Sequence, residues 1–84
     1  MVQHQTVTRM LKLRDVLSRR ARGTTSHYAD IQRGLFTKPV KTGIKASAWP
    51  EAEVEALIRA RIAGKTDDEI RALVAKLEAA RAKA

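Results

Sequence analysis

Ser26, His27 and Asp30 are the residue types of a hydrolytic triad, because they could supply a nucleophile, a base and a carboxylate. On a helix, however, adjacent residues point in different directions, so Ser26 and His27 would not face each other. His27 and Asp30 could pair only as a surface contact. A serine without a base beside it is not an activated nucleophile. We therefore expect no catalytic residue and no enzymatic activity.

Metal and cofactor chemistry has no better support. The chain contains two histidines, His4 and His27, and no cysteine, whereas a structural zinc site needs four such ligands. Gly43 is the only glycine of its loop, which does not suit a phosphate-cradling glycine-rich loop. We expect neither a metal site nor a cofactor.

The basic residues give a stronger signal, because they are concentrated in one part of the chain. Residues 1–49 hold ten Lys and Arg against two Asp, a net charge of +8, whereas residues 50–84 hold seven basic and seven acidic residues. A surface that serves solubility normally mixes both signs. The segregation favours a polyanionic partner for the first half; the alternative is a solvated basic face without a partner.

Two short helices are expected to carry many of these cations. Leu13, Val16 and Leu17 have the i, i+3, i+4 spacing of a helix. A brief strand could precede this helix, and Gly23 would end it. A second helix is expected over residues 25–33. Two short helices joined by a glycine-containing turn are typical of a helix-turn-helix.

The second helix has a polar first turn and a thin apolar face. Thr24 or Thr25 is expected to cap its start, since a threonine oxygen can accept from a first-turn amide. Tyr28 and Ile31 are three residues apart, which favours a place in the core for both. The tyrosine could instead stack or bond to a phosphate.

A β-hairpin is expected over residues 38–49. Pro39 breaks the helical periodicity and favours extended backbone before it, and residues 43–45 would form the tip. The hairpin ends at Trp49. This residue and Phe36 are expected in the core, since a chain with three aromatic residues must use them for packing.

Two longer amphipathic helices are expected after the hairpin. Pro50 would occupy the first position of one, which Gly64 would close, and Thr66 and Glu69 would form a capping box for the other. The stripe of the last helix either seals the core, which we favour, or meets another subunit. The two stripes are Val54, Leu57, Ile58 and Ile62, and then Ile70, Leu73, Val74 and Leu77.

These elements predict a mainly α fold with a small β-hairpin wing, that is, a winged helix-turn-helix with an added C-terminal helix. We expect a flexible N-terminal tail at 1–8, a DNA-binding domain at 9–64 and an amphipathic helix at 65–84 that packs on the domain or on a neighbouring subunit. Apolar runs are too short for a membrane span, and the first residues are too polar for a signal peptide. A cytoplasmic, nucleoid-associated protein is expected.

Double-stranded DNA is the polyanion that suits this arrangement. The second helix would enter the major groove N-terminus first while the hairpin contacts the adjacent backbone. Helix residues would contact bases, and lysines and arginines would contact phosphates. The expected recognition-helix residues are Thr24, Thr25, Ser26, His27, Tyr28, Gln32 and Arg33; the wing residues are Lys38, Lys41 and Lys45; the phosphate contacts are Arg19, Arg20 and Arg22.

Three segments, "MLKLRDVLSRR", "TTSHYADIQRGLFTKPVKTG" and "ASAWPEAEVEALIRARIAG", together resemble the AlpA family of prophage transcriptional regulators and the related excisionases. The resemblance covers approximately residues 9–64. It implies a MerR-like winged helix-turn-helix and a role on a prophage or integrative element. That role is either to activate transcription of excision genes or to bend attachment-site DNA as a recombination directionality factor.

The resemblance also implies site residues and partners. Base contacts carry over to Thr24, Thr25, Ser26 and Tyr28, and wing contacts to Lys41 and Lys45. Cooperative head-to-tail assembly of the chain on DNA, and an integrase as partner, are further hypotheses.

The chain departs from the family pattern at four positions. The family often has arginine where Thr24 and Ala29 stand, and commonly proline at Ile44 with arginine at Lys45. Without the two helix arginines, specificity would depend more on the wing, on phosphate contacts and on DNA shape. The alternative from another class is a non-DNA adaptor that binds a partner protein through its C-terminal amphipathic helices.

Overall fold

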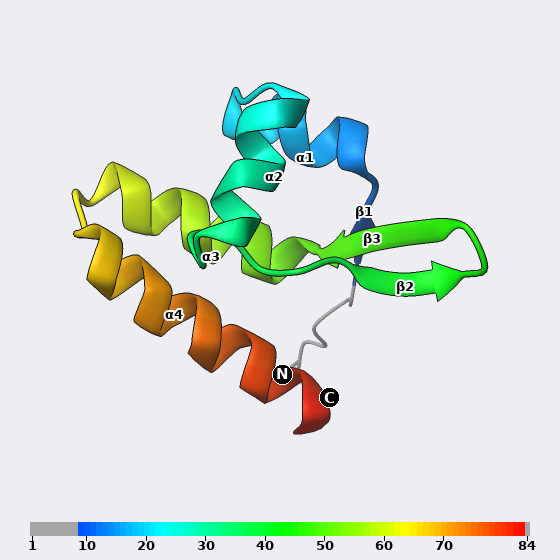
Figure 1. Ribbon diagram of the computed structural model, residues 1–84. Coiled ribbons are helices and arrows are strands. Elements are labelled where there is room, and N and C mark those ends of the chain that lie inside the picture. Colours follow the sequence, from blue (N-terminus) through cyan, green and yellow to red (C-terminus); the bar gives the residue numbers. More distant parts are fainter. Residues whose placement is uncertain (1–8, 84) are drawn as a thin grey trace, which may run out of the picture.

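The computed structural model describes residues 9–83, so the tail predicted at 1–8 lies outside the described residues. In this part of the chain four α-helices pack beside the base of a small antiparallel sheet, and the hairpin of that sheet projects to one side (Figure 1), which confirms the mainly α class. The elements are β1 (Met10–Leu11), α1 (Leu13–Arg20), α2 (Thr24–Gln32), β2 (Val40–Gly43), β3 (Ala46–Pro50), α3 (Glu51–Ile62), α4 (Asp67–Ala80) and a final 3-10 turn (Arg81–Lys83).

The sheet has the order β1-β3-β2, so the predicted hairpin is joined at its base by the brief strand before α1. Leu11 pairs with Trp49, and Val40 pairs with Ala48. The Trp49 indole is buried, and its Nε1 donates a hydrogen bond of 2.9 Å to the Thr37 carbonyl. Trp49 therefore ties the base of the hairpin to the domain, as expected from the sequence.

One hydrophobic core lies between the helices and the sheet base. The expected core positions of Phe36 and Trp49 are confirmed. The exception in the predicted stripes is Ile62, which lies in the last turn of α3 and is 80% exposed. The buried members are Leu11, Val16, Leu35, Phe36, Trp49, Val54, Leu57, Ala60, Ile70 and Val74.

The stripe of α4 packs on the domain. Ile70 and Val74 are buried, and Leu73 and Leu77 pack against the same cluster, so the favoured sealing of the core is confirmed. Figure 1 shows α4 running alongside α3. Burial of these side chains contributes roughly 1.5–3 kcal/mol for each that is fully buried, which a domain of this size needs.

Polar contacts from α4 and from the final 3-10 turn also hold the loop between α2 and the hairpin. Arg71 Nε donates a hydrogen bond of 2.8 Å to the Arg33 carbonyl at one end of this loop. Near its other end, the Glu78 carboxylate accepts a hydrogen bond of 2.8 Å from the Lys38 amide. Arg81 Nη2 donates a hydrogen bond of 2.6 Å to the Lys38 carbonyl. The last helix and the final turn thus fix the hairpin relative to α2.

The start of α2 differs from the prediction. Gly23, not a threonine, is the N-cap, and no side chain caps the helix. Thr24 is already the first helical residue, because Gly23 supplies the extended backbone (ψ 166°) from which the helix begins. The hydroxyls of Thr24 and Thr25 are therefore not used as a cap.

The starts of the two longer helices agree only in part with the prediction. Pro50 is not the first helical residue: it still pairs with Met10 at the end of β3, and Glu51 begins α3. The predicted capping box of α4 is confirmed. The Thr66 Oγ1 accepts a hydrogen bond of 3.2 Å from the Glu69 amide, and the Glu69 carboxylate accepts one of 2.8 Å from the Thr66 amide.

Ala21 ends α1 in the left-handed region, with φ 54° and ψ 44°. The Ala21 and Arg22 amides donate to the carbonyls of Ser18 and Leu17, which closes the last turn. This conformation costs a residue with a Cβ about 1 kcal/mol, whereas glycine adopts it freely. Ala21→Gly should therefore raise the free energy of unfolding by about 0.5–1 kcal/mol in urea titrations.

Ala63→Gly is the matched control, because Ala63 follows α3 with φ −74° in the right-handed region. There glycine only adds backbone entropy to the unfolded chain, and a loss of roughly 0.5–1 kcal/mol is expected. Equal losses for both variants would contradict the left-handed cap.

Candidate nucleic-acid interface

The exposed face of α2 is uncharged and rich in hydrogen-bonding groups. With 3.6 residues per turn, Thr25, Tyr28 and Gln32 lie on one side of the helix, and all three are exposed. Thr24 and Ser26, in the first turn, are also exposed. The structure thus brings together five of the seven residues predicted to contact bases.

The expected core position of Tyr28 is wrong, since its side chain is 42% exposed. The face that α2 turns inward carries His27 and Ile31 instead. The tyrosine ring packs edge-on against His27, with centroids 5.2 Å apart. Its exposed part is available to a partner of the α2 face.

His27, which was predicted to contact bases, is fully buried. Its ring stands edge-on to Phe36 and Trp49, with centroids 5.1 and 5.0 Å away, so it cannot reach a base edge from this position. Its Nδ1 lies 2.7 Å from Arg20 Nη1 and must accept that bond. The Nε2 then carries the proton, and it is buried without a partner among the described residues.

Asp30 is the centre of a buried ion-pair cluster. Its carboxylate, 3% exposed, accepts from Arg20 Nη2 at 2.7 Å and from Arg22 Nη2 at 2.8 Å. Burial alone would raise the pKa of Asp30, but the hydrogen bonds from Arg22 and Arg20 outweigh burial and lower it. The predicted surface pairing of His27 with Asp30 is therefore wrong, because packing of α1 against α2 encloses both.

The phosphate contact predicted for Arg20 is also wrong. Its side chain is 9% exposed, is committed to Asp30 and lies with its guanidinium carbon 4.1 Å from the Phe36 ring centroid. Arg22 keeps 42% of its side chain exposed while it binds Asp30, and Arg19 is 37% exposed beside Glu51. These two arginines remain able to meet an anion.

A pocket of about 550 Å³ lies between the end of α1, the segment that follows α2 and the C-terminal half of α3. Its floor is apolar, with Leu35, Phe36 and Leu57. Its rim carries arginines together with Asp67, which pairs with Arg61 at 3.2 Å. Within the described residues, the Arg33 side chain makes no hydrogen bond or ion pair. We call the four exposed rim arginines, Arg19, Arg22, Arg33 and Arg61, the arginine flank.

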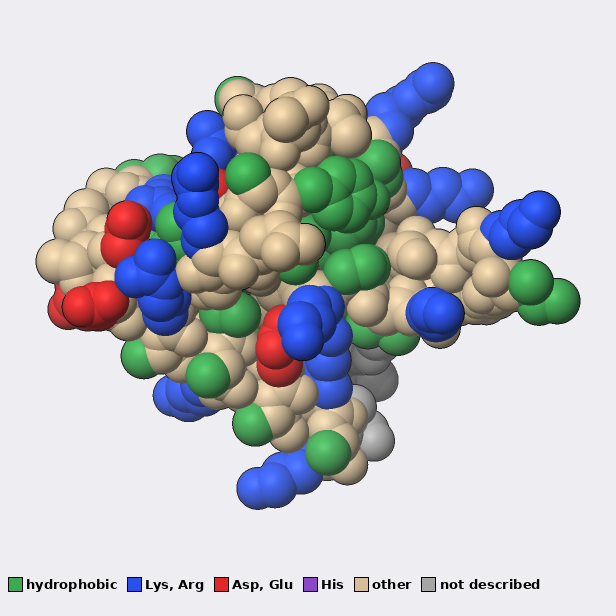
Figure 2. Space-filling model, viewed as in Figure 1, with side chains coloured by type: hydrophobic (Ala, Val, Ile, Leu, Met, Phe, Trp, Pro, Cys, Tyr) green, Lys and Arg blue, Asp and Glu red, His purple; other side chains and the backbone are tan. Residues whose placement is uncertain are grey.

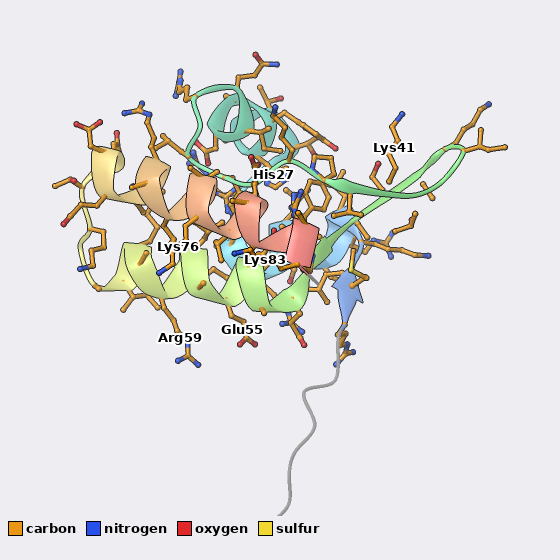
Figure 3. The ribbon with its side chains drawn as sticks, turned by 90° about the horizontal axis from the view of Figure 1, so that it is seen from below. His27, Lys41, Glu55, Arg59, Lys76 and Lys83 are labelled. Carbon is orange, nitrogen blue, oxygen red and sulfur yellow. The ribbon has the colours of Figure 1, made fainter. Side chains whose placement is uncertain are left out.

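The hairpin carries cations on the other side of α2. All residues from 41 to 47 are exposed, including Lys41 and Lys45, and the hairpin projects from the body of the domain (Figure 1). Figure 3 shows Lys41 pointing to the side on which α2 lies, whereas Glu55 and Arg59 point the opposite way. Lys38 is exposed at the hairpin base.

The α2 face therefore lies between two groups of cations, the arginine flank and the hairpin lysines. Figure 2 shows Lys and Arg side chains on both sides of α2, with a largely uncharged surface over the helix. Phosphate contacts need cations, whereas base edges are read by hydrogen-bonding side chains. Across this surface, cations are followed by hydrogen-bonding side chains and then by cations again. This is the order in which a DNA groove presents one phosphate backbone, the base edges and the other backbone.

No protein-family model, curated protein or solved structure matches this chain. None of the helices in residues 9–83 is long and apolar enough to cross a membrane. The functional conclusion therefore depends on the geometry and charge of the interface described above.

Proposed function

We propose that this chain binds double-stranded DNA as a winged helix-turn-helix, with α2 in the major groove and the β2–β3 hairpin as the wing. The observation that carries the proposal is the uncharged, hydrogen-bonding face of α2 between two groups of cations. A major groove is wide enough for one helix and is bordered by two phosphate backbones. The arginine flank would neutralise one backbone, and Lys41 and Lys45 the other.

The roles of individual residues follow from their exposure. Thr24, Thr25, Ser26 and Gln32 face outward and reach base edges, where a glutamine suits adenine and a threonine methyl suits thymine. Tyr28 adds a hydroxyl and an exposed ring edge. Lys38, at the hairpin base, completes the wing contacts.

In this proposal the chain serves a prophage or integrative element. It regulates transcription of excision genes, acts as an excisionase, or does both, and makes no covalent change in DNA. The resemblance of residues 9–64 to AlpA-type regulators supports this role. Genomic footprinting of the protein tests it: sites beside a promoter support the regulator, and sites within an attachment region support the excisionase.

The adaptor function has weaker support. It requires an exposed apolar stripe on the C-terminal helices, but Ile70 and Val74 of α4 are buried in the domain core. In the described part of α3, Ile62 is the one large apolar residue that is mainly exposed. An isolated exposed isoleucine is common on monomeric proteins.

The wing lysines give the direct test. On a duplex selected from a random library by the wild-type protein, Lys41→Ala and Lys45→Ala should each reduce the slope of log affinity against log salt by about 0.9. Because each lysine neutralises one phosphate, the double variant should bind roughly 30-fold more weakly at about 0.15 M salt. Fluorescence anisotropy at several salt concentrations measures both quantities.

Arg59→Ala is the matched control, because Arg59 is an exposed cation on the opposite side of the molecule (Figure 3). It should leave the affinity and the salt slope unchanged. Equal losses for the control and the lysine variants would indicate a general charge effect. Failure of the wild-type protein to bind any duplex at about 50 mM salt would overturn the proposed function.

A further inference from the structure

Ile44 stands at the outermost point of the hairpin and is 98% exposed. The strand β2 ends at Gly43 and β3 begins at Ala46, so Ile44 and Lys45 form the two-residue turn. All neighbours from 41 to 47 are exposed, and none of them joins the hydrophobic core. The tip therefore presents an isoleucine that no described part of this chain covers.

The surroundings of Ile44 are cationic. Lys45 follows it directly in the turn, and Lys41 extends from β2, both exposed. The register of the hairpin shifts by one residue between Lys41 and Gly43, a bulge that increases the local twist of the tip. An apolar residue between two cations suits a partner that is anionic at its edges and apolar within.

The reach of the hairpin fits a neighbouring minor groove. The strand β2, Val40–Gly43, extends about 13 Å at 3.3 Å per residue. One helical turn of B-DNA spans about 34 Å, so the centres of adjacent major and minor grooves lie roughly 17 Å apart along the axis. With α2 in the major groove, the hairpin and its tip side chains cover this separation.

We propose that Ile44 is an apolar wedge that enters the minor groove and partly unstacks one base step, so that the wing bends the duplex. This rests on the proposed DNA binding. Apolar side chains inserted from the minor groove kink the duplex towards the major groove, and pyrimidine–purine steps such as TA and CA/TG yield most easily. Lys41 and Lys45 hold the flanking phosphates during insertion.

Ile62 provides the comparison for Ile44, because both are exposed isoleucines and only Ile44 lies at the tip of the hairpin. Ile62 lies at the end of α3, on the rim of the arginine-lined pocket. It has no projecting hairpin to carry it into a groove. Ile62→Ala is therefore the matched control for Ile44→Ala, and neither change removes a core contact.

The experiment measures bending by energy transfer between dyes at the two ends of a selected duplex, at saturating protein and for all three proteins. The wild-type protein and Ile62→Ala should bend a duplex that has a TA step under the wing, and should bind it about tenfold more tightly than the same duplex with an A-tract there. Ile44→Ala should lose more than half of the bend and the whole TA preference. Its salt slope should stay that of the wild type, because no charge changes.

Two results would overturn the wedge. Ile44→Ala could bend and bind like the wild type, or the wild-type protein could bind without bending; in both cases DNA binding stands and the wedge fails. If the wild-type protein binds no duplex, the proposed function fails together with the wedge. Lys45→Ala separates the effect of charge from that of insertion. It should reduce the slope of log affinity against log salt but retain most of the bend at saturation.

Discussion

Asp30→Ala should lower the free energy of unfolding by about 3–5 kcal/mol. The substitution removes the carboxylate that accepts from Arg20 at 2.7 Å and from Arg22 at 2.8 Å. Arg20 would then remain as a buried cation without an anionic partner, next to His27 and Phe36. Because domains of this size have a total stability of roughly 5–15 kcal/mol, this one change should consume a large part of it.

Urea denaturation of the wild type and three variants measures this effect. Asp15→Ala is the control: Asp15 is exposed in the first turn of α1, and its loss should cost about 1 kcal/mol or less through the helix dipole. Arg20→Met combined with Asp30→Ala should recover part of the loss, since no buried charge is then left unpaired. A loss below about 1 kcal/mol for Asp30→Ala would contradict a structural ion-pair cluster.

The same cluster links stability to the interface. Arg20 and Arg22 come from the end of α1 and the turn, and Asp30 comes from the last turns of α2, so their bonds fix the angle between the two helices. Backbone bonds from Leu35 and Arg33 to the Asp30 carbonyl close α2 at the same residue. Asp30→Ala should therefore also weaken the proposed DNA binding, although Asp30 is buried.

Local patterns in the sequence predicted most elements of the fold. The apolar spacing of Leu13, Val16 and Leu17 predicted α1, and Thr66 with Glu69 predicted the start of α4, because both signals lie within one or two helical turns. Pro39 and the apolar run that ends at Trp49 predicted the hairpin for the same reason. These features need no knowledge of what packs against them.

The ion-pair cluster could not be predicted in this way. Arg20 and Asp30 are ten residues apart, and their pairing depends on the packing of α1 against α2. A weak signal was present, since His27 and Ile31 share one helix face at i, i+4, and Asp30 lies beside it. If this face had been taken as the inward one, the prediction would have placed His27 and Asp30 in the interior and Tyr28 at the surface.

Charge read along the sequence overestimated the free cations of the first half. Asp30 pairs with Arg20 and Arg22, and Glu51, from the second half, pairs with Arg19 at 2.7 Å. Contacts from α4 and the final 3-10 turn to the 33–38 loop are also invisible to local patterns, because they join residues about forty positions apart. Composition thus predicted a polyanionic partner, whereas packing decides which cations are exposed and could meet one.

Acid should destabilise the protein through His27, by about 3 kcal/mol between pH 7 and pH 4. Burial, assisted by the neighbouring Arg20 and Arg22, lowers the pKa of His27 from 6.5 to about 4, against the opposing effect of Asp30. The unfolded chain therefore binds a proton below pH 6.5 that the folded protein refuses until about pH 4. The stability that the neutral ring contributes is complete above about pH 7 and falls by about 1.2 kcal/mol per pH unit between pH 6 and 5.

Urea titrations from pH 7 to pH 5 measure this slope, because the stability that Asp30 contributes through its lowered pKa is lost mainly below that range. His27→Gln should flatten the slope whatever its effect on total stability, because glutamine can accept from Arg20 but does not titrate. His4→Gln removes the other histidine of the chain and shows which of the two rings is responsible. Imidazole NMR shifts of the folded protein give the direct reading: a His27 ring that titrates near pH 6.5 would contradict its burial without a partner for Nε2.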